Sequence, residues 1–509
     1  MKLIFLLQLK APKKYYIKPL GCIPIFAIMD IGKYEAVIGL EVHAQLQTNT
    51  KLFCGDAIAF GAAANTQISP ITMGHPGTLP KTNTKAIDFA VMLGLVCHCQ
   101  IVNKNYFARK NYFYPDLPKG YQISQHTTPI CKGGFVDIVV DGANKRVDLN
   151  RIHIEEDAGK SIHDLYDTET CIDLNRAGTP LLEIVTEPCL HSSEEAFAYI
   201  AEIRKLVRWI GVCDGNMEEG SLRCDANISI RLKGETRLGT KVEVKNVNSI
   251  RNVKRAIDAE IKRMIDLVEN GGTVTQQTRS YNVDNNTTSA IRDKEDANDY
   301  RYFADPDLTP FNLTEQYINN INAALPILPN ELIEQFKQDF ALSDYDANVL
   351  CDDKAVADFF NAAATLCTNY KAIANFILGP IKQYLNEHNT TIENIDLEAN
   401  KLVELINLID GGMVNFSIAA TKILPVVIAQ NKNPLQVAQD LNLLQTNNSN
   451  EIEDWINNVL AAMPDKVIEY KKGKKGLIGL FIGEIKKISK GKADPKIATD
   501  LLTKKLNQD

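Results

Sequence analysis

The sequence predicts an α+β protein with a cradle of antiparallel strands, then an all-helical region, then a small helical tail. Strand-like segments that alternate apolar and charged residues are concentrated in residues 30–325. Helical spacing of apolar residues dominates residues 326–445 and again residues 446–509. A chain of 509 residues is also too long for one hydrophobic core, so two to four domains are expected.

The first 29 residues differ from the rest of the chain. They are apolar and slightly basic, so a secretory signal is one interpretation. Lysines at positions 10, 13, 14 and 18 interrupt the apolar run, however, and the compact pattern begins after Met29. We therefore expect Met29 to be the natural start and residues 1–29 to be a non-native or disordered extension.

Two strand-like segments carry side chains that are costly to bury. Glu41 and His43 are separated by one residue, so they point to the same face of a strand. The same alternation places Arg151, His153 and Glu155 on one face. Carboxylates and imidazoles gathered in this way suit a hard divalent cation such as Mg²⁺. A solvated sheet face with ordinary charge pairs is the alternative.

Two further segments follow the same rule, with one apolar face and one charged face. The charged positions are Arg223, Asp225, Asn227, Ser229 and Arg231 in the first segment, and Lys241, Glu243 and Lys245 in the second. Four such segments favour a polar cradle that holds a charged substrate.

Helices and loops can also be predicted from the sequence. Residues Glu194–Ile210 and Val253–Val268 have helical spacing, and Ser192 and Ser193 are expected to cap the first. Residues 282–299 are rich in Asn and Asp, which predicts a loop. A linker is expected near residues 446–450, before the last helical unit.

Charge is spread unevenly. Residues 466–509 carry twelve lysines and five acids, a net charge of +7, which leaves −14 on the remainder of a chain whose total is −7. A basic tail on an acidic body indicates a polyanionic partner, although a solvated lysine-rich helix pair would look similar.

The cysteines and the hydropathy bear on location. Eleven cysteines without a framework spacing favour a reducing cytosol over a disulfide-stapled exterior. No apolar run reaches the length of a membrane span. We therefore expect a cytoplasmic protein with no membrane partner.

One short motif resembles a nucleotide loop but fails on chemistry. Gly159-Lys160-Ser161 could end a Walker A loop, yet the preceding residues are acidic and would repel phosphate. Magnesium offers a different route, in which acids hold the metal and the metal holds the phosphates. Glu155, Glu156, Lys160 and Arg176 would serve such a site.

Long motifs in a fixed order carry a family resemblance. They are residues 39–43 (GLEVH), 109–116 (RKNYFYPD), 121–125 (YQISQ), 153–160 (HIEEDAGK), 173–188 (DLNRAGTPLLEIVTEP), 218–229 (EEGSLRCDANIS) and 299–303 (DYRYF). The chain resembles the B subunits of aspartyl/glutamyl-tRNA(Asn/Gln) amidotransferases from about residue 34 to its C-terminus. The resemblance implies a glutamine-synthetase-like cradle as the catalytic domain, and a tail that contacts tRNA.

The resemblance also implies an activity. Such an enzyme uses ATP and Mg²⁺ to phosphorylate the side-chain carboxylate of Glu-tRNA(Gln), Asp-tRNA(Asn) or both, and ammonia then displaces phosphate. By motif, Glu41, His43, Glu156 and Glu243 would surround the metal, with Glu155 one step removed from it. Lys160, Arg176 and Arg223 are expected to hold the phosphates of ATP.

The ammonia source is expected to lie on a separate chain, because no glutaminase or amidase signature is visible in the sequence. The resemblance implies a heterotrimer in which the A subunit is the amidase and the C subunit is small. Two alternatives stay open: a free-standing ATP-dependent carboxylate–amine ligase acting on a small molecule, and a non-catalytic tRNA-binding scaffold. The first would not need the basic tail, and the second would not need the acidic cradle.

Many members of that family bind a structural zinc ion through two cysteine pairs. In this chain Cys54 remains, and Asp56, Ser69 and Thr72 stand where the other thiolates would be. Because a tetrahedral thiolate site cannot form from this set, no zinc is expected and local packing is expected to replace it.

Overall fold

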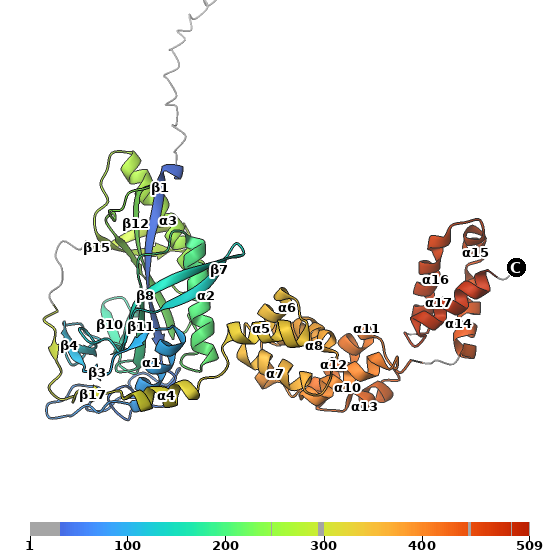
Figure 1. The fold of residues 1–509 in the computed structure, drawn as a ribbon, viewed down its shortest axis with the longest axis horizontal. Helices are drawn as coiled ribbons and strands as arrows, with labels where there is room; N and C mark the ends of the chain where they lie inside the picture. Colours follow the sequence, from blue (N-terminus) through green and yellow to red (C-terminus); the bar gives the residue numbers. More distant parts are fainter. Residues whose placement is uncertain (1–30, 246, 294–299, 446–448, 490, 508–509) are drawn as a thin grey trace, which may run out of the picture.

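The computed structural model describes residues 31–509 except 246, 294–299, 446–448, 490 and 508–509. The predicted extension, residues 1–29, and parts of the predicted loop and linker therefore lie outside the described residues. Along the chain, a sheet-containing part is followed by a helical part and then by the tail (Figure 1).

A mixed sheet of ten strands organises the first part of the described chain. Neighbouring strands of this sheet pair antiparallel, except for the parallel pair β13–β14. The spatial order is β15 (Thr287–Asp293), β14 (Gln277–Asn282), β13 (Val242–Lys245), β12 (Leu222–Leu232), β1 (Tyr34–Gln45), β11 (Pro180–Thr186), β8 (Ala143–Glu156), β6 (Cys131–Lys132) and β2 (Gln100–Ile101), with β7 (Phe135–Val140) paired to β8.

The central strand β1 shows why the sheet has two different faces. Ile38, Leu40 and Val42 are fully or almost fully buried in the hydrophobic core, whereas Glu41 and His43 alternate with them and face the other way. Helices α1 (Thr84–Val96), α2 (Ser193–Trp209) and α3 (Ile250–Glu269) contribute to the same core (Figure 1). The opposite face of the sheet carries polar and charged side chains.

The two predicted helices are confirmed as α2 and α3. Each begins after a serine whose side chain accepts a backbone hydrogen bond: Ser192 accepts from the N–H of Glu195, and Ser249 from that of Asn252. Their buried residues follow the predicted apolar spacing.

The predicted loop at 282–299 was wrong over residues 287–293, which form β15. Pairing with β14 explains the difference, because Arg279 donates to the hydroxyl of Thr288 (2.9 Å) and to its carbonyl (2.7 Å). A polar strand at a sheet edge needs few apolar residues, so composition alone indicated a loop.

Smaller strand groups flank the main sheet. They are β4 (Ala108–Asn111) with β5 (Tyr121–Ser124) and β16 (Phe303–Ala304), β9 (Lys160–Tyr166) with β10 (Glu169–Asp173), and β3 (Lys104–Asn105) with β17 (Phe311–Asn312). Strand β5 packs beside β8, where the serine hydroxyl of Ser124 donates to Glu155 (3.3 Å). The β4–β5–β16 group therefore borders the polar face.

Helix α4 (Glu315–Ala323) still belongs with the sheet-containing part, because it packs against α1. After residue 325, where the sequence predicts a change of pattern, the described elements up to residue 440 are helical. They are α5 (Pro329–Phe340), α6 (Asp344–Leu350), α7 (Lys354–Ala364), α8 (Tyr370–Phe376), α9 (Lys382–Glu387), α10 (Ala399–Asp410), α11 (Phe416–Ile418), α12 (Leu424–Gln430) and α13 (Pro434–Asp440). Two π-helical turns, at Ile377–Ile381 and Ala419–Ile423, join α8 to α9 and α11 to α12.

The tail has its own hydrophobic core. It is built from α14 (Ser449–Ala462), α15 (Pro464–Lys471), α16 (Ile478–Ile488) and α17 (Pro495–Leu506). Ile456, Phe481 and Leu502 are fully buried in a cluster separate from that of the rest of the chain. None of the described helices is both long and apolar enough to span a bilayer.

Candidate active site

Strand register assembles a row of charged side chains across the polar face. His43 on β1 lies opposite Arg223 on β12 and, on its other side, opposite Glu183 on β11. Glu183 in turn lies opposite His153 on β8. Residues opposite one another on neighbouring strands point to the same face, so the row is continuous over four strands.

The first cluster lies in the middle of this row. Ligand atoms of His43, Glu155 and Glu183 lie within 4.8 Å of one another. The Nε2 atom of His153 joins them, 3.3 Å from Oε2 of Glu183 and 3.7 Å from Oε2 of Glu155. His43 Nε2 is 3.5 Å from the same Glu183 oxygen. Glu183 is thus shared by two imidazoles.

Burial and charge oppose each other at this cluster. Burial alone would lower the pKa of His153, but the carboxylates of Glu183 and Glu155 outweigh it and raise the pKa to about 9. Burial likewise favours the neutral form of Glu183, yet the two imidazoles hold its pKa well below the usual value. The two imidazoles thus stabilise the ionised form of the Glu183 carboxylate.

A second cluster lies next to the first, and it contains acids only. Ligand atoms of Glu41, Asp225 and Glu243 lie within 4.8 Å of one another. The ammonium of Lys245 is 2.7 Å from Asp225 and 3.0 Å from Glu243. Although burial disfavours the charged lysine, Asp225 and Glu243 raise its pKa, so it partly neutralises the three acids. Asn227 donates to Glu41 at 2.8 Å.

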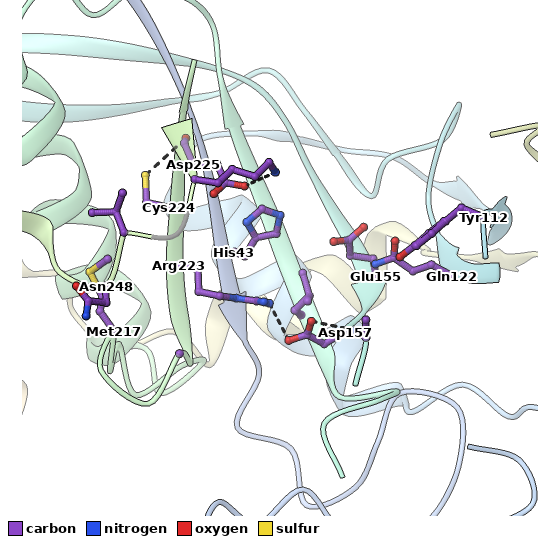
Figure 2. A pocket seen from close by; sticks show the side chains of 15 residues that line it. His43, Tyr112, Gln122, Glu155, Asp157, Met217, Arg223, Cys224, Asp225 and Asn248 are labelled. Atoms are coloured by element: carbon purple, nitrogen blue, oxygen red, sulfur yellow. Dashed lines mark hydrogen bonds and ion pairs between the residues drawn. The ribbon is translucent and has the colours of Figure 1, made fainter. Parts of the chain in front are cut away.

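A cavity of about 560 Å³ opens beside both clusters (Figure 2). Its lining includes His43, Glu155, Asp225 and Lys245. The guanidinium of Arg223 also lines it, and donates to Asp157 at 2.7 Å. The buried Nε of Arg223 has no hydrogen-bond partner, so this side chain retains a donor for an anion.

The structure does not bring Glu156 to either cluster. Its carboxylate accepts from Lys119 Nζ (2.6 Å) and from the backbone N–H of Ile123 (2.8 Å), and it is buried. Glu155, which the sequence analysis placed one step from the metal, takes the position expected for Glu156 beside His43. Glu41, His43 and Glu243, which were expected around one metal, fall into two groups: His43 belongs to the first cluster, and Glu41 and Glu243 belong to the second.

The three residues expected to hold phosphates are separated. Arg223 lines the cavity. Lys160 is exposed on β9, and the cavity lining does not include it. Arg176 donates to the carbonyls of Ala158 (2.9 Å) and Gly159 (2.7 Å), and these hydrogen bonds stabilise the turn after β8.

Residue-level reasoning missed Glu183 and did not assign roles to Asp225 and His153. Glu183 is the only acid in an apolar strand, Leu181–Val185, and that isolation was the available signal. Asp225 and His153 were visible as members of alternating strands. The sequence did not show which strands would lie together.

The four positions expected to replace a zinc site are close in space. Thr72 Oγ1 donates to Asp56 Oδ2 at 2.5 Å and lies 3.4 Å from the Cys54 sulfur. The fully buried ammonium of Lys51 lies 3.5 Å from the Thr72 hydroxyl and donates to the carbonyl of Leu174 at 3.3 Å. Hydrogen bonds thus link three of the four side chains, with one cation among them.

Comparison with known proteins connects this geometry to a family. A family profile described as the GatB/GatE catalytic domain matches residues 36–319, which include both clusters and the cavity. A second, described as a GatB domain, matches residues 358–506. The B subunit of the aspartyl/glutamyl-tRNA(Asn/Gln) amidotransferase of Geotalea daltonii is 45% identical over 477 residues, covering 93% of this chain and 99% of the relative.

The chain belongs to the family of amidotransferase B subunits. B subunits of the same name from Thermodesulfovibrio yellowstonii and Oleidesulfovibrio alaskensis are 44% and 45% identical, and each alignment covers 94% of this chain and 100% of the relative. The resemblance inferred from the motifs is confirmed. For this member of the B-subunit family, the profiles span the sheet with its clusters, most of the helical part and the tail.

Proposed function

We propose that this chain is the component of a tRNA-dependent amidotransferase that activates the side-chain carboxylate of Glu-tRNA(Gln), Asp-tRNA(Asn) or both. The observation that carries the proposal is the meeting of two acidic clusters and a cationic cavity wall on one sheet face. ATP supplies the phosphoryl group, which converts a poor leaving group into phosphate. Ammonia then attacks the acyl carbon, phosphate leaves, and Gln-tRNA(Gln) or Asn-tRNA(Asn) results.

The donor set fits Mg²⁺. Glu41, Asp225 and Glu243 offer carboxylate oxygens alone, which Mg²⁺ prefers, and the His43–Glu155–Glu183 set adds one imidazole. We therefore propose these six residues as ligands, with Glu156 outside the set. When bound, Mg²⁺ neutralises phosphate charge and orients the phosphates.

The remaining side chains have distinct tasks. Arg223 faces the cavity with an unpaired donor and would bind a phosphate of ATP. Lys245 is held charged between Asp225 and Glu243 and would neutralise the transferred group. Asp157 orients Arg223, because it also accepts from Gln45 (2.7 Å) and is fixed in place. Lys160 and Arg176 are not among the residues that line the cavity, so we assign them no contact with ATP.

Partners follow from the chemistry. The cavity wall has acids, a histidine and cations but no cysteine or serine paired with a base among its described residues, so ammonia must come from elsewhere. We propose the amidase, or A subunit, and the small C subunit as partners in a cytoplasmic heterotrimer. We also propose that the cradle is of the glutamine-synthetase kind and that the Lys51–Cys54–Asp56–Thr72 cluster works without zinc.

An ATPase measurement on the heterotrimer tests the proposal. We expect ATP hydrolysis that depends on misacylated tRNA and Mg²⁺. Turnover without tRNA would indicate a small-molecule ligase, and no hydrolysis under either condition would indicate a scaffold. The separate basic tail supports the tRNA substrate over a small molecule.

A further inference from the structure

Two cations lie directly opposite each other at the β6 edge of the polar face. Lys132 on β6 pairs with Arg151 on β8, while the neighbouring pair Cys131–Ile152 belongs to the buried core. Strand alternation therefore turns Lys132 and Arg151 to the same face as His153, two residues along β8 from Arg151.

This pair lacks the acid partners that other cations of the face have. In the described part of the chain, neither Lys132 nor Arg151 makes a hydrogen bond or ion pair through its side chain, and the Nε of Arg151 is buried without a partner. By contrast, Arg223 pairs with Asp157, and Lys245 with Asp225. Like charges opposite each other are unfavourable in a sheet. An anion bound between the two side chains would reduce their repulsion and give the buried Nε of Arg151 a hydrogen-bond partner.

The position of the pair separates it from the ATP cavity. Cations reach the cavity from β12 and β13, on one side of His43. The sheet order places β8 and β6 on the other side, beyond Glu183. Neither Lys132 nor Arg151 is among the residues that line the cavity. An anion held there would approach the His43–Glu155–Glu183 cluster from the side opposite to ATP.

A run of aromatic rings also leads to the cavity. His126, which is exposed, stacks on Tyr302 with ring centroids 4.0 Å apart and an interplanar angle of 6°. Tyr302 contacts Tyr300 (6.2 Å), and Tyr300 contacts Tyr112 (6.0 Å), which lines the cavity. His126 precedes Lys132 by six residues. A solvent-accessible ring stack on the same domain as a cation pair is a combination that suits single-stranded nucleic acid.

We propose that Lys132 and Arg151 bind backbone phosphates, and that the His126–Tyr302 stack holds a base, of the single-stranded acceptor end of the aminoacyl-tRNA. This inference rests on the proposed function and adds where the second substrate enters. The aminoacyl group would then reach the carboxylate clusters from the β6 side while ATP occupies the β12 side.

The test is ammonium-driven amidation by the reconstituted heterotrimer, with the KM for misacylated tRNA and the KM for ATP measured separately. For the double variant Lys132→Gln/Arg151→Gln we expect a KM for tRNA raised roughly tenfold, with a shallower salt dependence and an unchanged KM for ATP. Lys132→Gln alone, at an exposed site that should not disturb folding, should give part of the effect. His126→Ala should raise the KM for tRNA without changing the salt dependence, and His126→Phe should restore it.

The matched control is Arg146→Gln, which removes an exposed arginine from the same strand, where it pairs with Asp137. It should leave both KM values unchanged. An unchanged KM for tRNA in the double variant, or a raised KM for ATP, would overturn the inference, the latter by showing that the pair serves the nucleotide. Absence of product from the wild-type heterotrimer would instead overturn the proposed function.

Discussion

Glu155 and Glu156 are consecutive residues of β8, yet their carboxylates serve opposite faces of the sheet. Glu155 lies with His43 and Glu183 on the polar face. Glu156 turns the other way and is held by Lys119 and the backbone N–H of Ile123. The alternation of a strand makes this separation unavoidable, and it divides their expected roles.

The first prediction uses this pair as its own control. Glu155→Gln removes an anionic ligand from the first cluster, so we expect a loss of at least roughly a hundredfold in carboxylate phosphorylation, with tRNA affinity retained. Glu156→Gln should leave the Mg²⁺ dependence of the rate intact, because its carboxylate contacts Lys119 rather than the cluster. The rate of phosphate transfer, measured against Mg²⁺ concentration, distinguishes the two variants. If Glu156→Gln alone needed a higher Mg²⁺ concentration for its half-maximal rate, the assignment would be contradicted.

Glu183 is the second target, because two histidines share its carboxylate. Glu183→Gln should weaken binding of Mg²⁺, or of Mn²⁺ as its probe, by roughly tenfold or more in a calorimetric titration of the heterotrimer. Glu187→Gln, at an exposed acid of the same chain segment, should bind the metal normally. Equal affinities for the two variants would remove Glu183 from the ligand set.

The α+β class and the shared strand faces of some site residues could be predicted from residue patterns. Alternation correctly placed Glu41 with His43, and His153 with Glu155, because the period of two is a local property of the chain. It also implied that Glu155 and Glu156 diverge, but the motif comparison assigned the metal to Glu156 instead. In the structure Glu155, and not Glu156, belongs to the cluster with His43.

The remainder of the site depended on strand pairing. Glu183 reaches His43 and His153 because β11 lies between β1 and β8, and these strands are far apart in sequence. No local pattern specifies that order. The partnerless state of the Arg151 Nε depends likewise on which acids the fold brings near, so it could be seen only in the structure.

The third prediction concerns the cluster in place of zinc. Thr72→Val deletes the hydroxyl that contacts Asp56, Cys54 and Lys51, so it should lower the free energy of unfolding of the cradle by about 1–3 kcal/mol.

The urea transition can be followed through Trp209 in a Trp455→Phe background. Thr78→Val, which removes a hydroxyl bonded only to the His75 carbonyl at an outlying turn, should cost less. Stabilisation of the wild type by added Zn²⁺ would contradict the assignment.

The fourth prediction concerns the tail. A chain ending at Asn448 should still fold, because the tail has a separate hydrophobic core. Within its heterotrimer it should bind tRNA more weakly and with a shallower salt dependence, since fewer phosphates are neutralised. Binding isotherms at several salt concentrations decide this. Identical affinity and slope for the two chains would exclude the tail from tRNA binding.

The most direct test of the central claim traces one oxygen atom. Misacylated tRNA is prepared with ¹⁸O in the side-chain carboxylate and converted by the heterotrimer with ATP, Mg²⁺ and ammonium. If the carboxylate is phosphorylated, one of its oxygens leaves with the phosphate, so we predict one ¹⁸O atom in inorganic phosphate for each amide formed. Amidated tRNA accompanied by unlabelled phosphate would contradict the account, because ATP would then be hydrolysed without activating the carboxylate.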